Sequence, residues 1–158
     1  MRIIAVMLML CSTAWANTKD VEFIQHINPK VSQSAAENIS SYVNIYSSKY
    51  ELDPNLVISL MAVESNFKVK AVSPKKAYGL MQVNHNSWKK DPGYKKIVSD
   101  KRQLAHPRIN IEAGCFVLSE LRKQNNSRYV SLYLGERNYE YLQKIKRYRK
   151  LHKTGNYG

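Results

Sequence analysis

Residues 56–65 read Leu-Val-Ile-Ser-Leu-Met-Ala-Val-Glu-Ser, an apolar run that ends in a carboxylate. Asp53-Pro54 precedes the run, and this pair favours a helix start because Asp caps an N-terminus and Pro fits the first turn. On such a helix Glu64 falls between Leu60 and Val57, so it points from the apolar face rather than the solvent face. The sequence therefore predicts a helix over residues 53–66 with a carboxylate on its apolar side.

A carboxylate in this position has two interpretations. On an apolar face it has a partner or a raised pKa, because desolvation disfavours the charged form. A carboxyl group that is protonated near neutral pH can serve as a general acid. The alternative is a helix-end glutamate that bends back to solvent, and periodicity alone favours this alternative. Further motifs must decide between them.

Composition limits the class of protein. The chain has 158 residues, enough for one domain with a sizeable core, and 44% apolar residues exclude a disordered chain. Only 6 glycines and 5 prolines favour helices over a turn-rich β fold, so we expect a single, mostly α domain. The formal net charge of +13 indicates a polyanionic partner: nucleic acid, anionic lipid, or an acidic polymer such as bacterial cell wall.

The N-terminus has the pattern of a cleaved secretory signal. A positive start, an apolar run over residues 3–10 and the sequence Ala14-Trp15-Ala16 are its three marks. We expect a signal peptide over residues 1–16, cleaved after Ala16, and a mature chain exported to the periplasm over residues 17–158. The apolar run is too short to cross a bilayer, so no stable membrane span is expected after cleavage. The alternative is an N-terminal membrane anchor.

The cysteines and histidines predict no cofactor and no metal. Cys11 lies in the predicted signal, and the large Leu10 before it disfavours a lipoprotein cleavage site. Cys115 then stands alone in an apolar run, where a buried core position is expected, with no disulfide and no CxxC pair. The histidines show neither HxxxH nor HExxH spacing, and no glycine-rich phosphate loop follows a strand.

Other elements follow from capping and periodicity. The spacing of Ser34 and Glu37 is that of a capping box, which predicts a helix from there to about Tyr50. A short apolar segment, residues 21–24, is expected to pack on the core, and the basic residues 89–101 are expected to form an exposed connection. We expect further helical segments from about 109 to the Asn-Asn-Ser break at 125–127, over 129–134, and over 138–152.

Four segments in this order resemble the soluble lytic transglycosylase (SLT) catalytic domain, which is related to goose-type lysozyme. They are Glu64-Ser65, residues 77–84 (Ala-Tyr-Gly-Leu-Met-Gln-Val-Asn), residues 106–114 with the apolar positions after them, and residues 141–148. The resemblance covers about residues 39–148 and implies a lysozyme-like helical fold with a substrate cleft. With its signal peptide, the chain is most similar to small transglycosylases that accompany secretion, conjugation or pilus systems, or phage entry.

One segment departs from the family pattern. The family has Ala-Tyr-Asn-Ala-Gly before its late helix, whereas this chain has Ser-Leu-Tyr-Leu-Gly at residues 131–135. Tyr133 and Gly135 align with a one-residue adjustment, and the asparagine is missing. The contacts that Tyr133 makes with substrate are therefore carried over less directly than those of Glu64 or Gln82.

The resemblance implies a reaction and a site. The family cleaves the β-1,4 bond between N-acetylmuramic acid (MurNAc) and N-acetylglucosamine (GlcNAc) without water, because the muramoyl C6 hydroxyl attacks its own anomeric carbon and leaves a 1,6-anhydro end. The mature chain is poor in acids: Asp53 reads as a cap, Asp91 and Asp100 as loop residues, and Glu112 as a first-turn helix residue. The expected catalytic residue is Glu64, and the expected substrate-binding residues are Ser65, Gly79, Met81, Gln82, Asn84, Tyr133 and Tyr141.

Several of these positions also have structural interpretations. Ser65 can support the helix end, Met81 can fill the core, and Tyr141 can be a packing aromatic rather than reach towards Glu64. Asn110 can be a structural polar group or a ligand contact.

Two other functions stay open at this point. A hydrolytic muramidase would use Glu64 with a positioned water, and a catalytically silent chain would bind peptidoglycan without turnover. A nucleic-acid partner is not expected, because the chain has a signal sequence and no recognition motif. The expected partners are peptidoglycan and components of an envelope secretion or conjugation apparatus.

Overall fold

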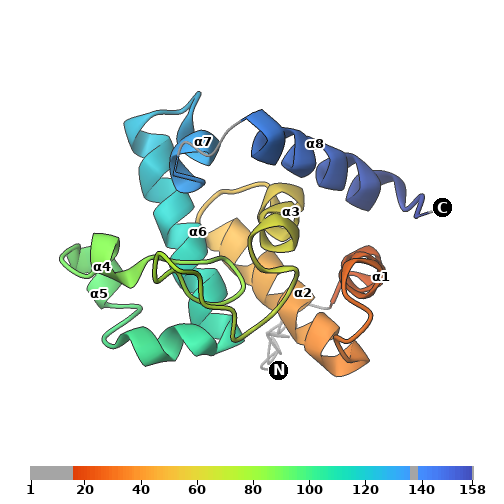
Figure 1. Ribbon diagram of the computed structural model, residues 1–158, viewed down its shortest axis with the longest axis horizontal. Helices are drawn as coiled ribbons and strands as arrows, with labels where there is room; N and C mark the ends of the chain where they lie inside the picture. The colour runs from red at the N-terminus through yellow and green to blue at the C-terminus, as the bar shows by residue number, and fades with distance from the viewer. Residues whose placement is uncertain (1–15, 136–138, 158) are drawn as a thin grey trace, which may run out of the picture.

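The computed structural model describes residues 16–135 and 139–157, and in these ranges the chain is built from helices without a β-strand. The predicted mostly α fold class is therefore confirmed. The predicted signal peptide lies, except for Ala16, outside the described residues. The elements, drawn in Figure 1, are α1 Thr18–Ile27, α2 Gln33–Lys49, α3 Pro54–Ser65, α4 His85–Trp88, α5 Pro92–Lys95, the 3₁₀ helix η1 Lys101–Ala105, α6 Pro107–Gln124, α7 Tyr129–Tyr133 and α8 Tyr139–Thr154.

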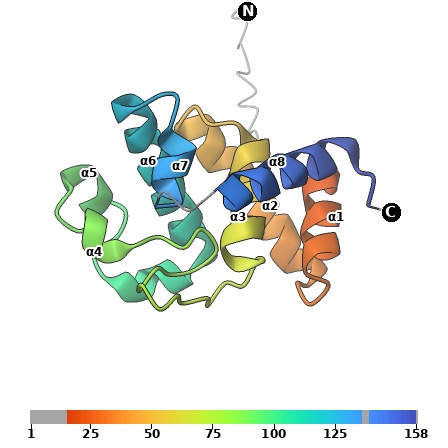
Figure 2. The same cartoon turned by 45° about the horizontal axis from the view of Figure 1, so that its top comes forward.

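Helix α3 is the buried centre of the fold. The predicted start is confirmed, because the Asp53 side chain accepts a hydrogen bond from the backbone N–H of Asn55 and Pro54 occupies the first turn. Residues 56–62 are all buried, as expected for a helix that is apolar on nearly every side. Helix α8 packs along α3, and α1 and α2 also contact it (Figures 1 and 2). The helix that carries Glu64 is thus held by neighbours on several sides.

In the N-terminal part of the domain, two details of the structure differ from the sequence prediction. The predicted cap of α2 is wrong: Ser32, not Ser34, accepts from the backbone N–H of Ala35 at 3.3 Å, and Glu37 accepts from the Gln33 side chain instead. Two nearby serines satisfy the same local rule, and the earlier one adds two residues to the helix. Residues 21–24 pack on the core as predicted, but they belong to a helix, α1, that the sequence did not indicate.

The connection over residues 89–101 is less exposed than predicted. Tyr94 and Val98 are buried, and the Tyr94 ring lies 6.5 Å from the ring of Phe116 on α6. Asp91 caps the short helix α5 by accepting from the backbone N–H of Tyr94. The few apolar residues among these lysines make too short a pattern to predict this burial, which depends on a partner distant in sequence.

The C-terminal helices lie close to their predicted positions. Helix α6 begins at Pro107, two residues earlier than expected, so Glu112 lies in its second turn rather than its first. Cys115 is buried, and the predicted break after residue 124 and the short α7 are confirmed. Helix α8 confirms the predicted last helix, with Ile145 and His152 buried.

The long loop between α3 and α4 is fixed by one amide side chain. Asn110 Oδ1 accepts from the backbone N–H of Met81 at 2.8 Å, and Asn110 Nδ2 donates to the carbonyl oxygens of Tyr78 (2.8 Å) and Leu104 (2.9 Å). A glycine is required at position 79, which follows Tyr78 in this loop. Its φ is +75°, and a Cβ there would lie 2.1 Å from Asn110 Nδ2. Of the two roles open to Asn110, the structure supports the structural one.

No helix among the described residues is both long enough and apolar enough to cross a membrane.

Replacing Asn110 by Ala tests this anchor. Asn110→Ala leaves the Met81 N–H and the Leu104 carbonyl oxygen without this buried partner, whereas the Tyr78 carbonyl oxygen keeps its bond from the Val83 N–H. The free energy of unfolding should therefore fall by about 3 kcal/mol in urea denaturation. The exposed Asn86 of α4 is the control, and Asn86→Ala should change it by less than about 0.5 kcal/mol. Equal, small effects of both substitutions would show that the loop does not depend on Asn110.

Candidate functional site

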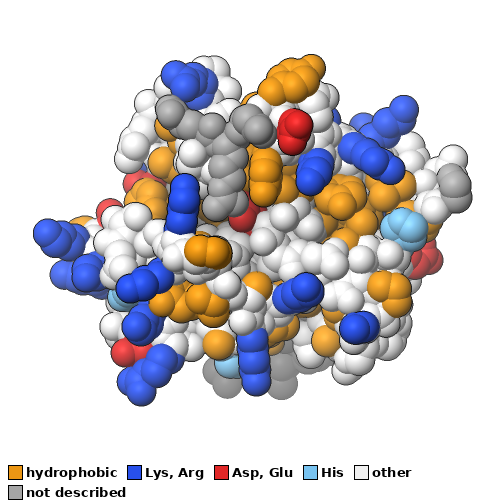
Figure 3. Space-filling model, viewed as in Figure 1, with side chains coloured by type: hydrophobic (Ala, Val, Ile, Leu, Met, Phe, Trp, Pro, Cys, Tyr) orange, Lys and Arg blue, Asp and Glu red, His pale blue; other side chains and the backbone are white. Residues whose placement is uncertain are grey.

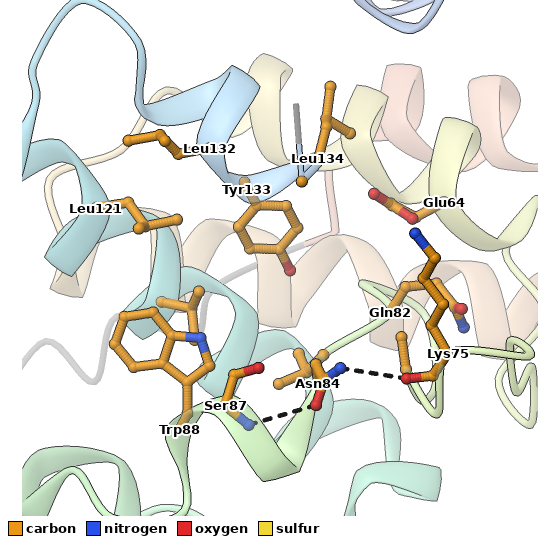
Figure 4. Close-up of a pocket in the computed structure, with 14 residues that line it drawn as sticks. Glu64, Lys75, Gln82, Asn84, Ser87, Trp88, Leu121, Leu132, Tyr133 and Leu134 are labelled. Carbon is orange, nitrogen blue, oxygen red and sulfur yellow. Dashed lines mark hydrogen bonds between the residues drawn. The ribbon is translucent and has the colours of Figure 1, made fainter. Parts of the chain in front are cut away.

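A cleft of about 310 Å³ lies where the end of α3, the loop before α4, α6 and α7 meet (Figure 4). Its described lining is apolar on the α6 and α7 side and polar on the loop side. The lining residues are Glu64, Lys75, Ala77, Gln82, Val83, Asn84, Ser87, Trp88, Val117, Leu121, Leu132, Tyr133, Leu134 and Gly135. Four of the eight predicted site residues, Glu64, Gln82, Asn84 and Tyr133, are therefore brought together here.

Glu64 supplies the one carboxylate in the described lining of the cleft. It lies in the last turn of α3, half-buried, with its side chain at the mouth of the cleft in Figure 4. The sequence left open whether this glutamate bends to a solvent face, and the structure places it in a cleft instead. Because α3 is buried along its length, the position of the Glu64 backbone is well defined.

Gln82 and Asn84 use most of their hydrogen-bonding groups within the loop. Gln82 Nε2 donates to the carbonyl oxygens of Ala71 (3.2 Å) and Gly79 (3.0 Å), so Oε1 is the atom that this side chain can offer to a ligand. Asn84 caps α4, and its Nδ2 donates to the carbonyl oxygen of Lys75 at 3.2 Å. Both residues shape the polar wall opposite Glu64.

Tyr133 joins α7 to the same loop. Its hydroxyl donates to the carbonyl oxygen of Met81 at 2.8 Å, and its ring faces the cleft in Figure 4. Burial raises the pKa of the Tyr133 phenol well above its usual value, and the negative charge of Glu64 raises this pKa further. Tyr133 is therefore neutral at physiological pH and keeps its proton for the hydrogen bond to the loop.

The other four predicted residues lie outside the described lining. Ser65 is buried and its hydroxyl donates to the carbonyl oxygen of Met61, as a helix-end residue does. Met81 is buried against α6, where a Cβ on Gly114 would lie 2.4 Å from the Met81 sulfur. Gly79 serves the packing on Asn110 described above. The substrate contacts of all three stay predictions.

Tyr141 lies in the first turn of α8, the helix that packs along α3. Its ring is half-buried, with the Lys144 amino nitrogen 5.5 Å from the ring centre. Whether it reaches Glu64 in the presence of substrate stays a prediction.

The sequence did not single out Lys75 and Trp88 as site residues. The Trp88 ring packs edge to face with Phe116, with ring centres 6.3 Å apart, and forms one end of the cleft (Figure 4). Lys75 lies in the loop opposite, in a turn that follows Ser73-Pro74. Trp88 could have been suspected as a site residue because it closely follows the predicted site residue Asn84. No local feature of the sequence distinguishes Lys75 from its neighbour Lys76.

In the described part of the chain, no group of three or more His, Cys, Asp or Glu side chains could hold a metal ion.

Comparison with known families identifies the chain. Residues 41–139 match the family described as "Transglycosylase SLT domain". The protein therefore belongs to the SLT transglycosylase domain family, and its fold is the single-domain, mostly α, lysozyme-like fold that the motifs predicted.

Three curated relatives match about half of the chain. Membrane-bound lytic murein transglycosylase E of Buchnera aphidicola subsp. Baizongia pistaciae is 35% identical over 86 residues, which cover 52% of this chain and 40% of that protein. Membrane-bound lytic murein transglycosylase C is 37% identical over 79 residues in Haemophilus ducreyi (48% and 22% covered) and 38% identical over 77 residues in Photorhabdus laumondii (47% and 22%). The chain thus spans less than half the length of these relatives. No solved structure matches it significantly.

The raised pKa of Tyr133 predicts how stability changes in alkali. Because the folded-state pKa lies above the unfolded value of about 10, this phenol contributes stability that is fully present below pH 10 and lost as the pH rises towards the folded pKa. Above pH 10, the unfolding free energy of Tyr133→Phe should fall less steeply than that of the wild type, by up to about 1.4 kcal/mol per pH unit.

Tyr139→Phe provides the control, because the Tyr139 side chain is 74% exposed. Its slope should equal that of the wild type in denaturant titrations at stepped pH. A Tyr133→Phe slope that also equals the wild type would contradict the burial of this phenol.

Proposed function

We propose that the protein is a peptidoglycan lytic transglycosylase. It would cleave the MurNAc–GlcNAc β-1,4 bond without water and leave 1,6-anhydroMurNAc ends. The observation that carries the proposal is the single carboxylate, Glu64, in the described lining of the cleft. Membership of the SLT family and the names of the curated relatives support the same reaction class.

The other acidic side chains near the sequence motifs have structural roles. Asp53 caps α3 and pairs with Arg149, and Glu112 pairs with Lys49 at 2.6 Å. The remaining two loop acids, Asp91 and Asp100, cap α5 and η1. An ordinary glycosidase needs two carboxylates that flank the bond. The described cleft supplies one, which suits a reaction whose nucleophile belongs to the substrate.

Glu64 would act twice in this mechanism. In its acid form it donates a proton to the GlcNAc O4 atom as the bond between that oxygen and MurNAc C1 breaks. The MurNAc acetamido oxygen stabilises the positive charge that develops at C1. The Glu64 carboxylate then accepts the proton of the C6 hydroxyl as O6 bonds to C1, which restores the acid. The attack is intramolecular, so it gains from proximity, and no water is consumed.

The two walls of the cleft suit a sugar chain. The leucines and the valine on the α6 and α7 side form an apolar wall, which limits the access of competing water. On the other side Gln82 Oε1 can accept from a sugar hydroxyl, and the Trp88 ring offers an apolar face for a sugar ring. Lys and Arg side chains far outnumber acidic ones on the face in Figure 3, and this excess would attract an acidic wall polymer.

We also propose that the signal peptide is cleaved after Ala16 and that the mature protein is located in the cell envelope. Asn17 caps α1, since its side chain accepts from the backbone N–H of Lys19 at 3.0 Å, so the first described helix starts directly after the proposed site. The intact mass of protein recovered from the periplasm should correspond to a chain that starts at Asn17. Retention of residues 1–16 in a membrane fraction would contradict this and favour the anchor.

The finer biological role is local opening of the wall for a secretion, conjugation or pilus machine, or for phage entry. Deletion of the coding sequence should reduce assembly of such a machine in the host, and restoration should require an intact Glu64. Normal assembly without the protein would contradict this role but not the enzymatic proposal.

Substitution of Glu64 tests the reaction. Wild-type protein should release muropeptides lighter by one water than hydrolytic products, and Glu64→Gln should release them at least about 100-fold more slowly. The control is Glu51→Gln, whose side chain is 88% exposed and lies outside the described cleft lining, and it should keep wild-type activity. Hydrated products would indicate a muramidase. Binding to peptidoglycan without any product would indicate a silent binding module.

A further inference from the structure

Lys75 lies in a closed turn at the rim of the cleft. The backbone N–H of Lys76 donates to the Ser73 carbonyl oxygen (2.9 Å), and the N–H of Ala77 donates to the Ser73 hydroxyl (3.1 Å). The Ser73 N–H in turn donates to the Ala77 carbonyl oxygen (2.9 Å). Three hydrogen bonds thus close residues 73–77 on themselves, and the Lys75 side chain extends from a fixed base.

A fourth hydrogen bond ties this turn to the polar wall. Asn84 Nδ2 donates to the Lys75 carbonyl oxygen at 3.2 Å, while Asn84 Oδ1 caps α4. In Figure 4 the amino group of Lys75 is directed across the mouth of the cleft towards Glu64. The ammonium group and the proposed proton donor thus belong to the lining of the same cleft, although Lys75 itself is exposed to solvent.

A cation in this lining distinguishes between substrates by their charge. A neutral sugar chain offers the ammonium group only hydroxyl and carbonyl oxygens, which are weaker acceptors than a carboxylate. A carboxylate on the substrate would form a charge-assisted hydrogen bond with the ammonium group, so Lys75 favours an anionic substrate over a neutral one.

We propose that Lys75 recognises a carboxylate on the muramoyl unit of the substrate, and thereby selects muramoyl glycans over neutral ones. The inference rests on the proposed function and names a specificity residue for it. The carboxylate has two possible sources: the lactyl group itself in strands that lack peptide, or the peptide stem attached to that group. Both present the same chemistry to the ammonium group of Lys75.

Lys76 provides a matched control in the same turn. It is the next residue, carries the same charge and is exposed, but it does not belong to the described lining of the cleft. Removal of either lysine changes the net charge equally, so long-range attraction to an anionic glycan falls equally. A difference between the two variants therefore measures a short-range contact.

The experiment measures glycan binding in protein that carries Glu64→Gln, so that substrate is not consumed. Three oligosaccharides of equal length serve as probes in calorimetry: a neutral chitooligosaccharide, a muramoyl oligosaccharide without peptide, and one with peptide stems. Lys75→Ala should weaken binding of a muramoyl probe about 3- to 10-fold and of the neutral probe less than about 2-fold. Lys76→Ala should change each Kd less than about 2-fold. Lys75→Arg, which keeps the charge, should retain most of the preference.

The outcomes separate the sources and the two proposals. A loss confined to the peptide-free probe assigns the lactyl carboxylate, and a loss confined to the stem-bearing probe assigns the stem. Equal losses on neutral and muramoyl probes, or no loss, would overturn the role of Lys75 and leave the transglycosylase proposal intact. If the parent protein binds no probe and the wild type releases no muropeptides, the proposed function fails and the inference fails with it.

Discussion

The cleft depends on the side-chain amide of Asn110. Two of its three hydrogen bonds, to Met81 and Tyr78, attach the loop before α4 to helix α6, and the third, to Leu104, attaches η1. The Tyr133 hydroxyl then attaches α7 to the same loop through the Met81 carbonyl oxygen. The bonds to Met81 and Leu104 are buried, so the loss of Asn110 would leave polar groups away from water without a partner. Asn110 and Tyr133 thus join the loop, α6 and α7, the three elements that face Glu64.

The two sides of the site are built by different means. Glu64 is positioned by hydrophobic burial, because α3 is enclosed by α1, α2 and α8. The polar wall on the loop side is positioned by hydrogen bonds, from the Asn110 anchor to the cap at Asn84, in addition to the buried Leu80 and Met81. One acid in a cleft with an apolar wall formed by α6 and α7 suits a reaction in which the substrate supplies its own nucleophile, since no second carboxylate and no water need to be placed.

The sequence predicts this arrangement where several local signals agree. The apolar run with Asp53-Pro54 defines α3, and the order of the motifs brings Glu64 and Gln82 into one cleft. A motif does not say whether its members pack or bind, so both interpretations of Met81 stayed open until the structure showed it buried. The burial of Tyr94 depends on a contact with α6, far along the chain, which no local pattern records.

The central claim is that Glu64 alone directs an attack by the substrate's own hydroxyl. Digestion of peptidoglycan in water labelled with heavy oxygen tests this most directly, with mass spectrometry of the new muramoyl ends. The account predicts ends that contain no heavy oxygen, because the C6 oxygen closes the ring. Heavy oxygen at the anomeric carbon of the released ends would contradict it, because that oxygen can come only from water.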